Sequence, residues 1–181
     1  MKKGHWLLTI ALALLVAVPA FAQVPSVGAY FDLAGTQSYQ QGHIGLNESH
    51  TVYVIARAEM LIGGAAYKIS IDDPNLLFMS ATYPAGIQIG DALNGVEVGF
   101  TEPVVGYFGV PVRVSTLSLF APSYWGEPAT ICVVPFPGKY NDVVLAAGQG
   151  VLFPASGLCG QLTSTVATDA DSWSHVKGLY R

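Results

Sequence analysis

Turn-forming residues divide this chain into short segments, and their spacing constrains the fold more than any other feature. Glycine- or proline-containing turns at residues 94–95, 102–103, 109–111 and 137–138 separate runs that are rich in β-branched and aromatic residues. Short runs at this spacing are typical of antiparallel strands, and no helical period extends over a long window before residue 163. The sequence therefore predicts an all-β, antiparallel sandwich of the jelly-roll type, with about nine strands.

Side-chain alternation predicts which residues of two strands face the core. Residues 66–71 alternate between apolar and polar types, which directs Tyr67 and Ile69 inward. In residues 112–120 the apolar positions change parity partway along the run. Because a slip of one residue reverses the facing of a strand, the simplest explanation is a β-bulge near Ser115 and Thr116.

The first 22 residues have the order of a secretory signal peptide. Two lysines precede an apolar run at residues 7–18, and Pro19 and the small-x-small sequence of residues 20–22 follow. The apolar run is short for a membrane span, and no second long apolar run follows it. We therefore expect cleavage after Ala22, no membrane span in the mature chain, and secretion to the periplasm, the cell surface or the extracellular space.

Charge restricts the partners of the mature chain. Twelve acidic and six basic side chains follow residue 22, which gives a net charge of about −6 with neutral histidines. An acidic surface repels phosphate backbones and anionic lipid headgroups, so we expect no nucleic-acid partner. The length suits one domain, and we assign residues 23–162 to the sandwich and residues 163–181 to a polar tail.

The tail combines a polar start with an apolar pattern near its end. Residues 163–168 either form a last strand or remain flexible, and a short amphipathic helix is expected after them. Trp173, Val176 and Tyr180 fall at near-helical spacing. We expect these three residues to dock on the sandwich, because an exposed apolar stripe is a liability unless it is used. The alternative is a free recognition tag.

Cys132 and Cys159 are the two cysteines of the chain, with 26 residues between them. In an exported protein the default interpretation of such a pair is one disulfide, which would add roughly 3 kcal/mol of stability by the chain-entropy model. Two buried free thiols are the alternative. No CxxC or HxxxH spacing occurs, so we expect no metal site and no cofactor.

Catalytic motifs are missing from the sequence. The histidines His43, His50 and His175 have no nucleophile motif beside them and are expected to be surface residues on loops. No G-x-S-x-G is present. A glycosidase pair would have to come from the scattered carboxylates Glu48, Glu59, Asp91, Glu97, Glu102 and Glu127. The acidic turn at residues 72–75 is interpreted as a plain turn rather than a calcium site. We therefore expect that the protein is not an enzyme.

Aromatic residues near turns give the best ligand hypothesis from residue types alone. Tyr124, Trp125, Tyr107 and Tyr140 lie in or beside expected loops. A row of exposed rings on one face would make a carbohydrate-binding platform. The alternative is that these rings plug the ends of the sandwich, since aromatic burial dominates the energetics of protein cores.

One stretch resembles a known family. Residues 64–77, GAAYKISIDDPNLL, resemble the part of cohesin-type domains in which a strand ends in a D-P-x-x-L turn, and residues 83–86 follow as the glycine-containing loop does there. The similarity extends over roughly residues 48–135. It implies a cohesin-like, carbohydrate-binding-like β-sandwich of a secreted bacterial protein, with a binding or scaffolding role. No site residue of that family can be matched to this sequence.

Together these observations predict a non-catalytic secreted domain that recognises a protein or polysaccharide partner outside the cytoplasm. Two alternatives remain open. One is a glycan-active hydrolase or lyase on a jelly-roll scaffold, and the other is a structural subunit of a cell-surface assembly, which would need an unpaired edge strand. Fold alone does not decide among these, because function lies in sites that many sandwiches share or lack.

Overall fold

The computed structural model describes residues 24–43, 48–106, 110–121 and 128–165, and the regular structure in these ranges is entirely β-strand. The strands are β1 (Ser26–Tyr30), β2 (Tyr39–His43), β3 (Glu48–Arg57), β4 (Leu61–Ile71), β5 (Leu77–Thr82), β6 (Gly86–Asp91), β7 (Gly95–Val105), β8 (Val112–Ala121), β9 (Ala129–Val134), β10 (Val143–Ala147) and β11 (Leu152–Thr165). The predicted all-β class is confirmed. The described residues contain eleven strands rather than about nine, in part because β1 and β2 have no clear sequence pattern.

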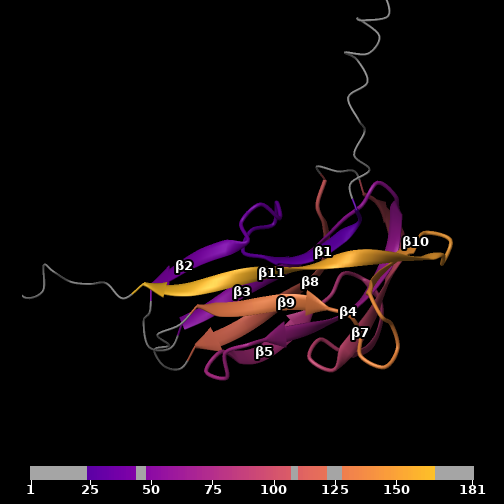
Figure 1. Cartoon of the computed structure of the whole chain (residues 1–181). Coiled ribbons are helices and arrows are strands. Elements are labelled where there is room, and N and C mark those ends of the chain that lie inside the picture. Colours follow the sequence, from indigo (N-terminus) through magenta and orange to yellow (C-terminus); the bar gives the residue numbers. More distant parts are fainter. Residues whose placement is uncertain (1–23, 44–47, 107–109, 122–127, 166–181) are drawn as a thin grey trace, which may run out of the picture.

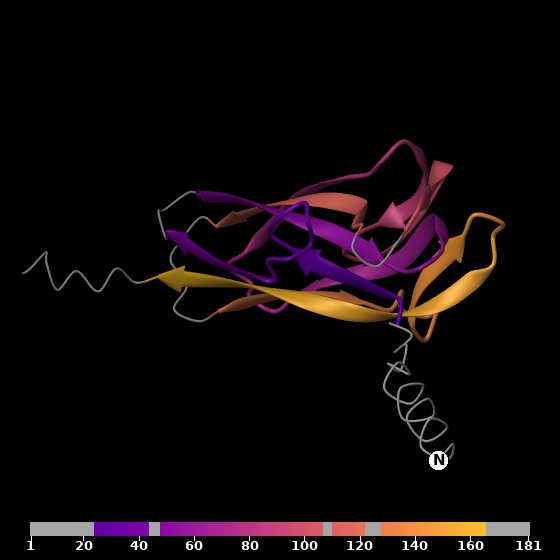
Figure 2. The same ribbon diagram turned by 90° about the horizontal axis from the view of Figure 1, so that it is seen from above.

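Strand pairing places β6 at one edge of a continuous, folded-over sheet. Its order is β5-β8-β3-β1-β11-β10-β4-β7-β6, with β9 between β11 and β4 and with β2 beside β11. Figures 1 and 2 show the long strand β11 running along the length of the molecule, where it joins the two layers. Neighbouring strands are antiparallel except for β1 and β2, which both run parallel to β11.

The core lies between the layer of β3 and β8 and the layer of β4 and β10. Val54 and Leu117 come from the first layer, and Tyr67, Ile69 and Leu145 come from the second, each at most 1% exposed. The predicted inward facing of Tyr67 and Ile69 is therefore confirmed. Burial of these side chains is the main driving force for closing the two layers.

The predicted bulge in β8 is present and lies within one residue of the expected position. Val54 pairs with Ser115, but the next residue, Ile55, pairs with Arg113, which leaves Val114 as the extra residue. The bulge turns both Val114 and Ser115 into the core. There the Ser115 hydroxyl accepts a 2.6 Å hydrogen bond from the hydroxyl of Tyr67.

The predicted turn at residues 102–103 is wrong, because β7 continues through it to Val105. Val104 pairs with Ile62 and Gly99 pairs with Gly64, so the β7 residues between Gly99 and Val104 have no partner on β4. Proline cannot donate a ladder hydrogen bond and is tolerated in a strand where pairing lapses in this way. Pro103 thus marks an irregularity in a strand rather than its end.

The predicted disulfide is confirmed, because Cys132 of β9 and Cys159 of β11 lie opposite each other and are bonded. Strand β11 continues to Thr165, which agrees with a last strand at the start of the polar tail. The expected helix and its docking residues Trp173, Val176 and Tyr180 lie outside the described residues. No helix capable of crossing a membrane occurs in the described part of the chain.

Candidate functional site

An exposed apolar surface covers the outward side of β6, β7, β4 and β10, and we call it the outer face. Glu97 of β7 lies opposite Ile89 of β6 on one side and opposite Ala66 of β4 on the other. Directly opposed residues point to the same side of a sheet, so the pairing defines the surface. Its residues are Ile87, Ile89, Glu97, Gly99, Gly64, Ala66, Val144, Ala146 and, from β11, Leu152.

Glycines and alanines form the floor of the outer face, and large apolar residues form its rims. Ile87 and Ile89 are 71% and 60% exposed on one rim, and Leu152 is 52% exposed on the other. Between them lies a shallow hollow of about 260 Å³. A Cβ added to Gly64 would collide with the carbonyl oxygen of Val98, so the close approach of β4 and β7 requires glycine. Exposed apolar side chains gathered around a hollow are typical of a binding surface.

A charged cluster also borders this hollow, which Glu97 and Tyr140 both line. The Glu97 carboxylate accepts one 2.7 Å hydrogen bond from Nζ of Lys139 and a second, also 2.7 Å, from the hydroxyl of Tyr140. Lys139 Nζ lies 5.8 Å from the ring centroids of both Phe136 and Tyr140. The carboxylate on the outer face is thus paired within the chain, and the other residues that define this surface are apolar or glycine.

Hydrogen bonding within this cluster shifts three pKa values. The hydrogen bond from Lys139, followed by that from Tyr140, lowers the pKa of Glu97. The hydrogen bond to the Glu97 carboxylate raises the pKa of both Lys139 and Tyr140. Because the pKa of Glu97 is lower in the folded state than in the unfolded state, its stabilising contribution is present at neutral pH. That contribution disappears as the pH falls through the lowered pKa.

A titration followed by NMR tests this cluster. We expect the carboxyl carbon of Glu97 to titrate with a midpoint below the ordinary value of 4.5. In the variant Lys139→Ala the midpoint rises, because the carboxylate loses its charged donor. Lys68→Ala, which removes a lysine of β4 outside the cluster, serves as the control and leaves the midpoint unchanged. An ordinary midpoint in the wild-type protein would contradict the assigned hydrogen bonds.

Of the four aromatic residues predicted to bind a ligand, Tyr140 alone lies within the described residues. It lines the hollow of the outer face, and its hydroxyl donates a hydrogen bond to the Glu97 carboxylate. Tyr107, Tyr124 and Trp125 lie outside the described residues. Whether Tyr140 contacts a ligand therefore stays a prediction.

The isoleucines of the outer face were missed by the sequence analysis. Residues 86–91, GIQIGD, alternate in the way that predicts a half-buried strand, and alternation does not say which side is covered. In the structure every residue of β6 is exposed, because β6 is an edge strand and its isoleucines point away from the core. The two glycines of this run, Gly86 and Gly90, were the available signal of an irregular edge, and both have a positive φ in the structure.

Side chains of Asp32 and Arg57 hold the loop that follows β1. The Asp32 carboxylate accepts hydrogen bonds from the backbone N–H groups of Thr36 and Gln37 and closes the loop after β1. The Arg57 guanidinium donates to the carbonyl oxygens of Ala34 and Gly35 in the same loop. Because the Asp32 carboxylate and the Arg57 guanidinium both bond to this loop, a structural role is favoured for these two residues.

The acidic turn at residues 72–75 is a turn, as the sequence predicts. Asp73 accepts a hydrogen bond from the backbone N–H of Asn75, and Asp72 accepts one from the backbone N–H of Thr130.

The expectation that His50 is a surface loop residue is wrong, because it lies buried in β3 opposite Leu119. Within the described ranges, no three His, Cys, Asp or Glu side chains cluster in a way that could hold a metal ion.

Comparison with solved structures identifies a cohesin-like fold. A non-cellulosomal cohesin from the archaeon Archaeoglobus fulgidus is 9% identical, and the match covers 84% of this chain and 99% of that one, with a TM-score of 0.53. The third ScaB cohesin of R. flavefaciens, in complex with a group 1 dockerin, is 14% identical over 77% of this chain and 95% of its own, with a TM-score of 0.53. A type II cohesin from the cellulosome of Acetivibrio cellulolyticus is 12% identical over the same shares, also with a TM-score of 0.53.

No family model and no curated relative matches the sequence. At identities this low the structural likeness concerns the fold alone. The cohesin-like sandwich expected from roughly residues 48–135 is confirmed, and the match to each of these three cohesins covers 77% or more of the chain.

Proposed function

We propose that this chain is an exported, non-catalytic binding module that holds a partner protein against its outer face. The observation that carries the proposal is the hollow of about 260 Å³ between the exposed rims of Ile87, Ile89 and Leu152. Burying such side chains contributes about 25 cal/mol for each Å² of apolar surface removed from water. A sequence that keeps them exposed on a well-packed sheet is best explained by a partner that covers them.

The composition of the outer face indicates the chemistry of that partner. Its one carboxylate, Glu97, is already paired with Lys139, so a charged partner surface gains little there. An apolar stripe, such as one side of an amphipathic helix, fits a shallow hollow with a floor of small residues. The likeness to cohesins supports a protein partner, since one of the similar cohesins is in complex with a dockerin. The signal-peptide pattern of residues 1–22 supports a partner outside the cytoplasm.

Substitution of the rim isoleucines tests the proposal. The double variant Ile87→Ser/Ile89→Ser is expected to fold normally, because both side chains are exposed. Wild-type protein immobilised on beads is used to recover the partner from secreted and cell-surface protein of the source organism. The affinity of the purified partner is then measured by calorimetry for each variant. The double variant is expected to bind the partner at least tenfold more weakly, because truncating central apolar contacts has effects of this size in other interfaces.

A matched control comes from the opposite edge strand. Leu77 and Met79 of β5 are 44% and 60% exposed but lie away from the outer face. The variant Leu77→Ser/Met79→Ser should retain full partner affinity. Equal loss in both variants, or full binding by the β6 variant, would refute the assignment of the outer face. A recovered polysaccharide in place of a protein, or hydrolysis of a glycan by the pure chain, would favour the alternative functions.

A further inference from the structure

A second hollow, of about 390 Å³, lies between β7 and β8 and is separate from the outer face. The segment that connects β5 to β6 also contributes to its lining. A cavity of this size can hold a ligand of one or two small rings. The lining residues are Pro84, Ala85, Phe100, Thr101, Glu102, Val104 and Arg113.

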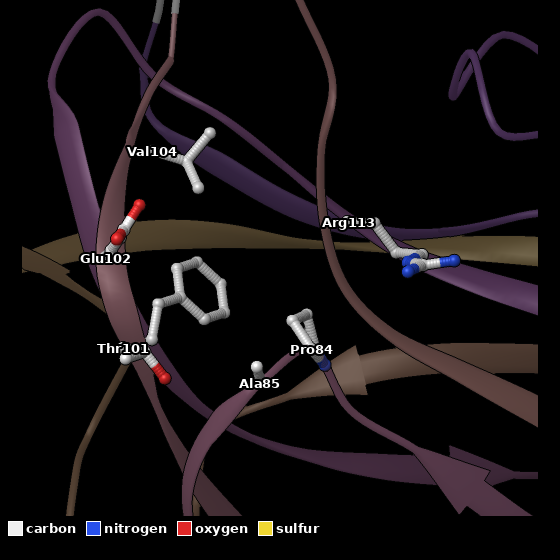
Figure 3. A pocket seen from close by; sticks show the side chains of 7 residues that line it. Pro84, Ala85, Thr101, Glu102, Val104 and Arg113 are labelled. Atoms are coloured by element: carbon white, nitrogen blue, oxygen red, sulfur yellow. The ribbon is translucent and has the colours of Figure 1, made fainter.

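The lining places an apolar surface between two opposite charges. Phe100, Thr101, Glu102 and Val104 line the hollow from the irregular stretch of β7, where pairing with β4 lapses between Gly99 and Val104. Figure 3 shows Glu102 and Val104 on one side of the hollow and Arg113 of β8 on the other, with Pro84 between them in this view. The hollow is thus an apolar surface with a carboxylate at one side and a guanidinium at the other.

The two charged groups of the hollow have no partner among the described residues. Glu102 and Arg113 are exposed, and neither makes a hydrogen bond or an ion pair with another residue of the described ranges. The other arginine of the described residues, Arg57, donates two hydrogen bonds to backbone carbonyl groups. The Glu97 carboxylate likewise accepts a hydrogen bond from Lys139. Glu102 and Arg113 therefore differ from these groups in being available to a ligand.

The chemistry of these groups selects the class of ligand. A carboxylate only accepts hydrogen bonds and a guanidinium only donates them, whereas a hydroxyl group does both. A polyhydroxylated ring can therefore satisfy Glu102 and Arg113 together while its C–H face lies on the apolar surface. The two charges cancel, so the site favours a neutral ligand over an ion. A free amino acid fits less well, because its two charges lie on one carbon rather than on opposite sides of the apolar surface.

From this geometry we propose that the hollow between β7 and β8 binds one residue of a neutral saccharide. The sugar ring rests on Phe100 and Pro84, Glu102 accepts hydrogen bonds from its hydroxyl groups, and Arg113 donates to their oxygens. The site uses none of the aromatic residues that the sequence singled out. It would give the module a second, glycan-directed attachment point beside the protein-binding outer face.

NMR titration of the full mature chain tests the site with defined probes. The probes are cellotetraose, xylotetraose, mannotetraose and chitotetraose as neutral oligosaccharides, and trigalacturonate as an anionic one. At least one neutral probe is expected to shift the backbone amide resonances of Ala85, of residues 100–102 and of Val104. Trigalacturonate is expected to bind at least tenfold more weakly than that probe, because its carboxylates cannot donate a hydrogen bond to Glu102.

Two conservative variants and one control complete the experiment. Arg113→Gln and Glu102→Gln remove one charge each from exposed positions, so the melting temperature is expected to stay unchanged. Each should weaken binding of the neutral probe roughly tenfold or more, since hydrogen bonds to charged groups are the strong ones. Glu59→Gln, an exposed glutamate that does not line the hollow, should bind as the wild type does.

Three results would overturn the proposal. The first is that none of the four neutral probes shifts the resonances of the hollow. The second is that both glutamine variants bind as tightly as the wild type. The third is that trigalacturonate binds more tightly than every neutral probe. Partner-protein binding by the Ile87→Ser/Ile89→Ser variant is measured separately, so failure of either site is distinguished from failure of the other.

Discussion

Replacing Tyr67 with alanine is expected to lower the free energy of unfolding by about 4 kcal/mol. Tyr67 is fully buried in β4 and belongs to the main core cluster. Truncation removes a large aromatic side chain from between the two layers and leaves a cavity that the surrounding strands can close only in part. Urea denaturation followed by tryptophan fluorescence and circular dichroism measures the loss as a lower midpoint with an unchanged slope.

Conservative variants separate the contribution of the ring from that of the hydroxyl. The Tyr67 hydroxyl donates a 2.6 Å hydrogen bond to Ser115, and burial keeps it protonated by raising its pKa. Tyr67→Phe should therefore cost about 1 kcal/mol, because Ser115 loses its donor in the core. In the Tyr67→Phe background, Ser115→Ala should cost less than it does in the wild type, since the pair is already broken. A cost below about 2 kcal/mol for Tyr67→Ala would contradict the tight packing of this core.

Local sequence was sufficient to predict the parts of the fold that depend on alternation and turn chemistry. The facing of β4 follows from the polar positions that separate Tyr67 and Ile69. The bulge in β8 follows from the change of parity around Ser115, and the turn at residues 72–75 from side chains that bind their own backbone. Each of these features is determined within a few residues, so a single segment contains the information.

Features that depend on distant segments were not predictable in the same way. The parallel pairing of β1 and β2 with β11 joins residues more than a hundred positions apart, and no local pattern specifies it. Pro103 looks like a turn residue because the lapse in the pairing of β7 with β4, a distant segment, cannot be seen in the local sequence. The outer face was missed for a related reason. The alternation of Ile87 and Ile89 is the same whether the core or the solvent lies on that side.

Removing the disulfide is expected to lower the free energy of unfolding by about 3 kcal/mol. The bond closes a loop between residues 132 and 159, which lie 27 positions apart, so it restricts the unfolded chain far more than the folded one. In the folded state, strand pairing alone already holds Cys132 opposite Cys159 on β9 and β11. The double variant Cys132→Ala/Cys159→Ala should therefore keep the same fold. Its melting temperature should be roughly 6–12 °C lower for a domain of this size.

Reduction of the wild-type protein provides the matched control for this prediction. Because the stabilisation comes from the covalent link, a reducing agent should lower the melting temperature of the wild type by about as much as the double variant loses. The double variant itself should not respond to reduction. If the wild type melts at the same temperature with and without reducing agent, the bond does not restrict the unfolded chain. The pairing of β9 with β11 would then hold this part of the sheet without the covalent bond.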